Sequence, residues 1–209
     1  MSDPDLRLAR KACRGDRRAL GRLYERHKSR LLGYLVRMLG RRQLAEDVFQ
    51  EVWVKVLQNI DRYSPESGAS FRSWLFRVAA NAAVDRIRYE SRREGARRTS
   101  PDEGHDPDDV ELLVSTAPGP EREAGGRHAA EVLAAMLRRL PDRQRAAVLL
   151  RHQQGMSYPE IAAVLAVPQG TAKTLVHRGV LALRDALSRS LGNASPETGP
   201  EKDTHGEMP

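Results

Sequence analysis

The chain has 209 residues, of which 35 are Lys or Arg and 28 are Asp or Glu, so its formal net charge is +7. Only 5% of the residues are aromatic, which favours helices packed through Leu, Val and Ala over aromatic-rich sheets. The single cysteine, Cys13, excludes an internal disulfide framework and a cysteine-based zinc site. No apolar run approaches the ~18 residues that a membrane helix needs. These features predict an all-α, cytoplasmic protein without membrane insertion.

Charge is distributed unevenly along the chain. Residues 1–100 carry 23 basic and 12 acidic side chains, and residues 128–192 carry 9 and 4. The residues between them, 101–127, carry 2 basic and 8 acidic side chains. Two basic blocks separated by an acidic spacer favour two modules that face a polyanion such as nucleic acid.

Composition divides the chain into two small helical domains, each expected to have its own core. Pro, Gly, Asp and Glu dominate residues 95–127. This segment cannot bury enough apolar surface to offset its ordering entropy, so we expect a flexible acidic linker. The sequence therefore predicts domains at 1–94 and 128–192, followed by a disordered tail at 193–209.

Helices are expected throughout the first domain. A short helix is predicted at 4–14, and a long amphipathic one at 17–39 stops at Gly40. A third helix is predicted at 44–60 and a fourth, after a polar loop, at 71–93.

The helix predicted at 44–60 has two contrasting sides. Helical spacing gathers an apolar stripe of Ala45, Val48, Phe49, Val52, Trp53 and Val56. The opposite side carries Asp47, Gln50, Glu51 and Val54. Any surface helix exposes one side to solvent, so the pattern alone does not decide whether this polar side faces solvent or a protein partner.

The helix predicted at 71–93 carries an unusual polar stripe. Its apolar face comprises Phe71, Leu75, Val78, Ala82 and Tyr89, and the adjacent face carries Arg77, Asn81, Asp85, Arg88 and Arg92, with Trp74 at the edge. Arginine can follow a phosphate backbone, and Asn or Asp can hydrogen-bond an unpaired base. The preceding loop, with Ser64 and Ser67, is small and polar enough to hold a base rotated out of its stack. Trp74 and Tyr63 are each, taken alone, also candidates for the core.

The second domain is expected to contain a helix-turn-helix. Helices are predicted at 128–140 and from Pro141 to Gly155, and a Ser157-x-x-Glu160 capping box begins a short helix through Ala166. A break at 167–170 precedes a last helix to about Leu191. The expected seam between the last two helices is Ile161, Ala162 and Leu165 against Val176, Val180 and Leu183.

In such a motif the second helix enters the major groove of DNA. Amide and hydroxyl groups can read base edges there, while Lys and Arg neutralise phosphates. The candidate DNA-contacting residues are Gln169, Thr171, Lys173, Thr174, His177 and Arg178. A helical hairpin that binds nothing is the alternative.

Three stretches, in chain order, are LYERHKSRLLGYLVRMLGRRQLAEDVFQEVWVKVLQ, FRSWLFRVAANAAVDRIR and LRRLPDRQRAAVLLRHQQGMSYPEIAAVLAVPQGTAKTLVHRGVLALR. Together they resemble regions 2 and 4 of an extracytoplasmic-function sigma factor of the sigma-70 family. The resemblance covers about Leu20–Arg93 and Ala129–Leu187. It implies an initiation factor that binds the clamp and flap of core RNA polymerase together with promoter DNA, under an anti-sigma factor, with no small-molecule substrate, cofactor or metal.

The resemblance also assigns roles to the candidate residues. It implies that Asp47, Gln50, Glu51 and Val54 face polymerase, that the 71–93 stripe and the Ser64–Ser70 loop recognise the −10 element, and that the last helix reads the −35 element. Two positions that are commonly basic in the family's last helix are apolar here, and Gly179 sits mid-helix at a cost of roughly 1 kcal/mol relative to Ala.

Three other classes of protein fit less well. An enzyme is disfavoured because the six histidines are scattered and no phosphate loop or nucleophile motif is present. A helix-turn-helix repressor would not need the arginine stripe beside a polar loop. An anti-sigma or adaptor protein would not need two basic modules.

Overall fold

A computed structural model describes residues 4–64, 70–96 and 123–192 of the chain. Every regular element in these ranges is a helix, which confirms the all-α prediction. The elements are α1 (Pro4–Cys13), α2 (Arg17–Leu39), α3 (Arg42–Asn59), the short 3-10 helix η1 (Ile60–Arg62), α4 (Phe71–Ala96), α6 (Glu123–Arg138), α7 (Asp142–His152), α8 (Tyr158–Leu165) and α9 (Gln169–Gly192). Below, the first module is α1 to α4 and the second module is α6 to α9.

Local sequence signals fix several helix ends. The Asp16 side chain accepts hydrogen bonds from the backbone N–H groups of Arg18 and Ala19, at 2.9 and 3.0 Å, and so caps α2. Gly40 ends that helix with a φ of 71°, in the left-handed region that glycine adopts without strain. These caps explain why the predicted ends of α2 are right.

Several predicted helix boundaries differ from the observed ones. Helix α6 begins at Glu123 rather than at 128, and α4 continues to Ala96. The pair Gly125-Gly126 lies inside α6, and the low helix propensity of glycine hid this first turn from sequence analysis. The domain limits at 94 and 128 stay predictions, and most of the predicted linker and the whole tail lie outside the described residues.

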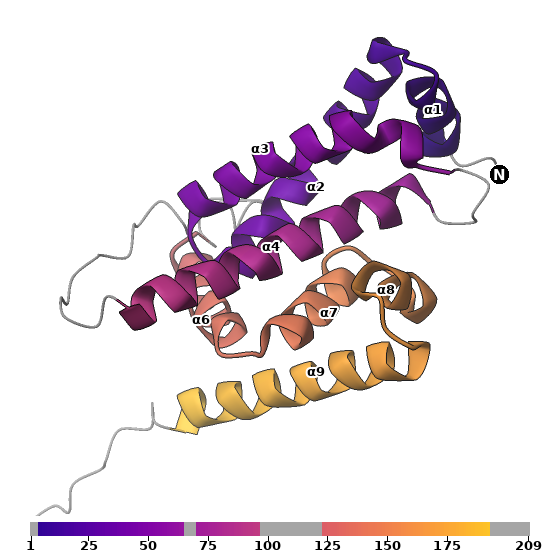
Figure 1. Ribbon diagram of the computed structural model, residues 1–209. Coiled ribbons are helices and arrows are strands. Elements are labelled where there is room, and N and C mark those ends of the chain that lie inside the picture. Colours follow the sequence, from indigo (N-terminus) through magenta and orange to yellow (C-terminus); the bar gives the residue numbers. More distant parts are fainter. Residues whose placement is uncertain (1–3, 65–69, 97–122, 193–209) are drawn as a thin grey trace, which may run out of the picture.

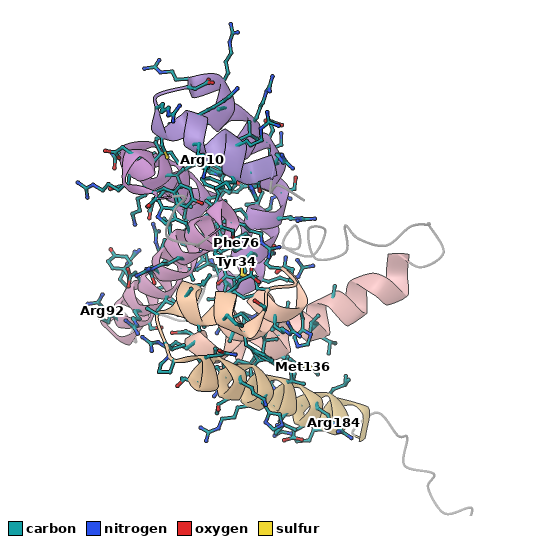
Figure 2. All side chains as sticks on the ribbon, turned by 90° about the vertical axis from the view of Figure 1, so that its right-hand side faces the viewer. Arg10, Tyr34, Phe76, Arg92, Met136 and Arg184 are labelled. Carbon is teal, nitrogen blue, oxygen red and sulfur yellow. The ribbon has the colours of Figure 1, made fainter. Side chains whose placement is uncertain are left out.

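The core of the first module is built from large side chains. Tyr34 of α2 and Phe76 of α4 are both fully buried, with ring centroids 5.3 Å apart in an edge-on arrangement. Figure 2 shows this pair near the middle of the molecule, where the first module meets the helices of the second. The apolar stripe predicted for α3 is buried as expected, with Phe49 only partly so.

The two modules pack against each other. Figure 1 shows α7 and α8 lying between α4 and α9, so the second module covers one side of the first. The buried apolar residues form one cluster that runs from α1 to α9. The two predicted domains therefore share buried contacts, which leave no pattern in either sequence alone. No helix in the described ranges is long and apolar enough to span a bilayer.

Candidate functional site

The outer side of α3 is a polar surface with two exposed apolar side chains. Asp47, Gln50 and Glu51 are exposed on it, as the helical spacing predicts. Val54 is 50% exposed and Leu57, which sequence analysis missed, is 59% exposed. Large apolar side chains in contact with solvent beside carboxylates are typical of a protein-binding surface. We call these five residues the α3 face.

One carboxylate of the α3 face is already paired. Glu51 accepts a hydrogen bond from Arg86 of α4, so this ion pair bridges the two helices. The side chains are partly exposed, at 46% and 23%, and such a surface pair contributes little to stability. Its effect is to fix the position of the Glu51 carboxylate on the α3 face.

The structure brings the predicted arginine stripe together along α4. Arg77, Asn81, Asp85, Arg88 and Arg92 are all exposed. Figure 2 shows Arg92 near the end of α4, far from Arg10 of α1. The predicted apolar face of α4 is confirmed except at Tyr89, which is 49% exposed. The guanidinium carbon of Arg93 lies over the Tyr89 ring, 5.7 Å from the ring centre.

Three aromatic rings support the start of α4. Tyr63 is buried, Phe71 is buried and Trp74 is partly buried, with ring centroids 5.4 to 5.9 Å apart. Tyr63 is thus a core residue, while Trp74 keeps one side at the surface. Ser64 is exposed next to this cluster, and Ser67 lies outside the described residues. The aromatic cluster holds the chain at both edges of the predicted base-binding loop.

A groove of about 390 Å³ runs between α3 and α4. Its lining combines Trp74, Val78, Asn81, Ala82 and Asp85 of α4 with Lys55, Asn59 and Arg62. Sequence analysis missed the last three. Their spacing of four and three residues marks a second polar side of α3, which could have been found by continuing the helical pattern into η1. An indole, an amide and cationic groups around one groove can stack and hydrogen-bond an unpaired base.

The helix-turn-helix is formed by α8 and α9. Ser157 and Glu160 make the predicted capping box, and Pro159 lies in the first turn of α8. Helix α9 begins at Gln169, so that residue belongs to the helix and not to the preceding break. The six candidate DNA-contacting residues are all exposed, and the Thr174 hydroxyl donates to the backbone carbonyl of Gly170 at 3.0 Å.

The packing seam between α8 and α9 differs from the prediction. Val176 is buried, but Val180 is 39% exposed. The buried positions of α9 are instead Ala172, Val176 and Gly179. A methyl group built at Gly179 would come within 2.5 Å of Val148 Cγ2 on α7. Gly179 therefore permits the close approach of two helices, which a pattern of large apolar residues does not reveal.

Two further observations concern histidine, cysteine and acidic side chains in the described ranges. They contain no group of three or more His, Cys, Asp or Glu side chains that could hold a metal ion. Cys13 donates a hydrogen bond to the backbone carbonyl of Ile60 at 3.1 Å, and burial raises the pKa of its thiol. A thiol with a raised pKa is a poor nucleophile at neutral pH.

In the part of the chain that the structure describes, these features combine an all-helical fold, a helix-turn-helix and a separate groove lined by an indole, an amide and cationic groups, an arrangement suited to a promoter-recognition factor. The family model for Sigma-70 region 2 matches residues 23–93, and the model for Sigma-70 region 4 matches residues 130–183. The chain belongs to the sigma-70 family of RNA polymerase sigma factors, in its extracytoplasmic-function group.

Known relatives agree with this assignment. The ECF RNA polymerase sigma factor SigE of Mycolicibacterium smegmatis is 33% identical over 80% of this chain, which spans 61% of that relative. The RNA polymerase sigma factor NccH of Alcaligenes xylosoxydans xylosoxydans is 34% identical over 91% of this chain and 97% of its own. The solved structure of CnrH in complex with the cytosolic domain of CnrY matches 92% of this chain and all of CnrH, with a TM-score of 0.62 and 26% identity.

Proposed function

We propose that this sigma factor binds core RNA polymerase through the α3 face and through the second module, and directs initiation at promoters with a −10 and a −35 element. The observation that carries the proposal is the juxtaposition of two unlike surfaces on neighbouring helices. The α3 face combines carboxylates with exposed apolar side chains, while α4 presents arginines, an amide and an indole.

The chemistry of the α3 face suits a protein and not DNA. Asp47 and Glu51 would repel phosphates, whereas they can pair with arginine or lysine on a partner. Val54 and Leu57 supply apolar area that a partner can bury. In the family this helix binds the clamp of the largest polymerase subunit, and we assign the same partner here.

The groove beside Trp74 suits the unpaired strand of a melted −10 element. Trp74 offers a surface for stacking, Asn81 and Asp85 offer hydrogen-bonding groups, and Arg88 and Arg92 can follow the phosphates. Lys55, Asn59 and Arg62 complete the opposite wall. The exposed residues at the start of α9 would then read the duplex −35 element.

Control by a partner protein is part of the proposal. CnrH, a protein of similar fold, was solved in complex with the cytosolic domain of CnrY. We expect an anti-sigma factor to regulate this chain in the cytoplasm in a corresponding way. The chain itself is not an enzyme, because polymerase supplies the catalysis.

Run-off transcription with purified core polymerase on a library of upstream DNA fragments tests the proposal. We expect transcripts from selected fragments only when this protein is present. Asp47→Arg with Glu51→Arg should weaken binding to core polymerase, while Glu25→Arg, an exposed charge reversal on α2, should not. Palindrome-specific binding at nanomolar concentration without polymerase would instead indicate a repressor.

The −10 assignment has its own test. Asn81→Ala with Arg88→Ala should reduce promoter opening, followed by permanganate reactivity of unpaired thymines, and should leave polymerase binding intact. Arg22→Ala removes an exposed arginine of α2 and serves as the control. Normal permanganate reactivity in the double variant would contradict the role of the α4 groove.

A further inference from the structure

Helix α1 carries a row of cations on its exposed side. Arg7, Arg10 and Lys11 of the helix and Arg14 directly after it follow one another at helical spacings of three and four residues, and all four are exposed. We call these four residues the α1 stripe. Like charges four residues apart on a helix repel each other, and the stripe contains two such pairs. The stripe therefore destabilises the helix that presents it.

No acidic side chain of α1 compensates for this charge. The only carboxylate of the helix is that of Asp5, which lies on the side that packs on α2. It pairs there with Arg26 at 3.2 Å and with the His27 ring at 2.8 Å. In the described part of the chain, no member of the α1 stripe forms an ion pair. The stripe is thus available to an anion from outside the protein.

The start of α2 adds positive charge beside the stripe. Arg17 and Arg18 lie in the first turn of that helix and are both exposed. Cations are unfavourable at a helix N-terminus, because the helix dipole is positive there. The carboxylate that precedes them, Asp16, accepts hydrogen bonds from backbone N–H groups as the cap of α2. A bound anion would relieve the repulsion at both helices.

The chemistry of the stripe favours phosphates over a lipid surface. A helix that binds a membrane surface needs a free apolar side. The apolar side of α1 packs into the first module, where Ala9 and Ala12 are 0% and 3% exposed. Guanidinium groups in a row instead match a row of phosphates, which each group can bind through two parallel hydrogen bonds. The expected ligand is therefore a nucleic-acid backbone.

The stripe adjoins the groove between α3 and α4. In the last turn of α1, the Cys13 thiol donates to the backbone carbonyls of Ile60 and Tyr63, at 3.1 and 3.5 Å. Those two residues flank Arg62, which lines the groove together with Trp74. A strand that leaves the groove past Arg62 therefore reaches the α1 stripe.

The two ends of the groove lead to different parts of a promoter. Arg88 and Arg92 continue from it along α4, and Figure 2 shows Arg92 far from Arg10. Helix α4 ends at Ala96, from which the chain continues to the module that would read the −35 element. The Arg92 end would then face upstream DNA, and the α1 stripe lies at the downstream end.

We propose that the α1 stripe, together with Arg17 and Arg18, binds the phosphates of the unpaired promoter strand directly downstream of the −10 element. The identity of the strand rests on the proposed function, which this second site deepens. Contacts to phosphates carry no sequence information, so the site holds the opened strand without selecting the promoter.

Two probes made from one selected promoter test the proposal. Both are duplex upstream and carry the unpaired −10 strand, which ends directly after the element in the short probe and continues to the start site in the long one. A triple variant, Arg7→Gln with Arg10→Gln and Arg14→Gln, removes three charges and keeps helix propensity. With core polymerase bound, we expect it to lose about tenfold in affinity for the long probe and no more than about twofold for the short one.

Salt dependence gives a more specific signature. Each phosphate contact on a single strand contributes about 0.7 to the slope of log affinity against log salt concentration. Loss of three contacts should lower the slope by about 2 for the long probe and leave it unchanged for the short one. The variant loses only repulsive pairs, so its urea midpoint should not fall.

A matched variant removes the same charge elsewhere. Arg22→Gln with Arg30→Gln and Arg41→Gln changes three exposed arginines outside the stripe and should bind both probes as the native chain does. Equal affinity losses of the stripe variant on both probes, or no loss on either, would overturn the proposal. Weaker binding of the stripe variant to core polymerase would overturn it too, because the stripe would then contact a protein.

A cross-link locates the strand directly. In a Cys13→Ser background, which keeps a donor for the two carbonyls, Arg10→Cys can carry a photoactivated cross-linker. We expect attachment to nucleotides downstream of the −10 element, and none from the exposed Glu25→Cys of α2. Attachment only to upstream nucleotides, or none, would overturn the assignment.

A probe without promoter sequence separates this inference from the proposed function. If the native chain with core polymerase selects no promoter, the proposed function fails. The free chain can still be titrated with oligothymidine, for which the stripe variant should show a salt slope lower by about 2. An unchanged slope there would overturn the stripe as a phosphate-binding site.

Discussion

The two modules contain similar helices but fill their interiors differently. The first module buries large side chains such as Tyr34, Phe71 and Phe76, which remove much apolar area from water. The described part of the second module buries no aromatic ring; it buries aliphatic side chains such as Leu150, and Gly179 brings α7 and α9 close together. The comparison teaches that the first module depends on the volume of its aromatic rings, whereas the α7–α9 contact of the second depends on close approach, so the two should respond differently to loss and to gain of side-chain atoms.

Removal of volume from the first module should have the largest effect. Phe76→Ala deletes a fully buried ring that contacts Tyr34, and we expect a loss of about 4 kcal/mol in the free energy of unfolding. Urea unfolding followed by circular dichroism measures it. Leu187→Ala in α9, where the side chain is 47% exposed, should change stability by no more than about 0.5 kcal/mol. Similar values for the two variants would contradict the comparison.

Loss of one buried cation should be the most damaging change in the second module. Arg145 donates to the backbone carbonyls of Met38, Arg138 and Leu140, and burial lowers the pKa of its guanidinium. Arg145→Met keeps an apolar stem but leaves these carbonyls without their donor, at a cost of about 3 kcal/mol. Arg143→Met, an exposed neighbour, is the matched control. Equal midpoints in urea would show that the carbonyls find other donors.

Most of the fold could be predicted from the sequence, because its signals are local. The stop at Gly40 and the capping box at Ser157 act over three or four residues, and both were predicted; the helix start at 17 was predicted too, although its cap at Asp16 was not singled out. The role of Arg145 could not be predicted. Its partners lie up to 107 residues away in the chain, and a helix pattern marks such an arginine as solvent-exposed.

In the candidate site, too, the sequence predicts what lies on one helix and misses what two helices form together. Helical spacing places the α4 stripe and four residues of the α3 face correctly, since each surface lies on one helix, but it missed Leu57. The groove between them needs two helices, so its residues Lys55, Asn59 and Arg62 were missed. The roles of all these residues in binding stay predictions.

A side chain made larger should destabilise the second module at Gly179 but not the first module at Gly21. Gly179→Ala places a methyl group 2.5 Å from Val148 Cγ2, so we expect a net loss of about 1 to 2 kcal/mol despite the better helix propensity of alanine. Gly21→Ala in α2 has nothing within 4 Å and should gain up to about 1 kcal/mol. Urea unfolding measures both. In a Val148→Ala background Gly179→Ala should cost less, and an equal cost there would place the strain elsewhere.

The smallest expected effect is the pH dependence contributed by His27 of the first module. Its ring is buried against Phe71, and Nε2 lies 2.8 Å from Asp5 Oδ2 of α1, while Arg26 and Arg30 of α2 oppose protonation. Burial is the main cause of its lowered pKa, and it outweighs the opposite effect of Asp5. The unfolded chain therefore binds the proton first as pH falls.

It follows that His27 contributes stability that is complete above its ordinary pKa of about 6.5 and is lost as pH falls through the lowered value. Urea midpoints measured across this range should decline more steeply for the native chain than for His27→Gln. The exposed His152→Gln is the control and should keep the native slope. Equal slopes in the native chain and His27→Gln would mean that the pKa of His27 is the same in the folded and unfolded states, and that burial of its ring against Phe71 does not oppose protonation.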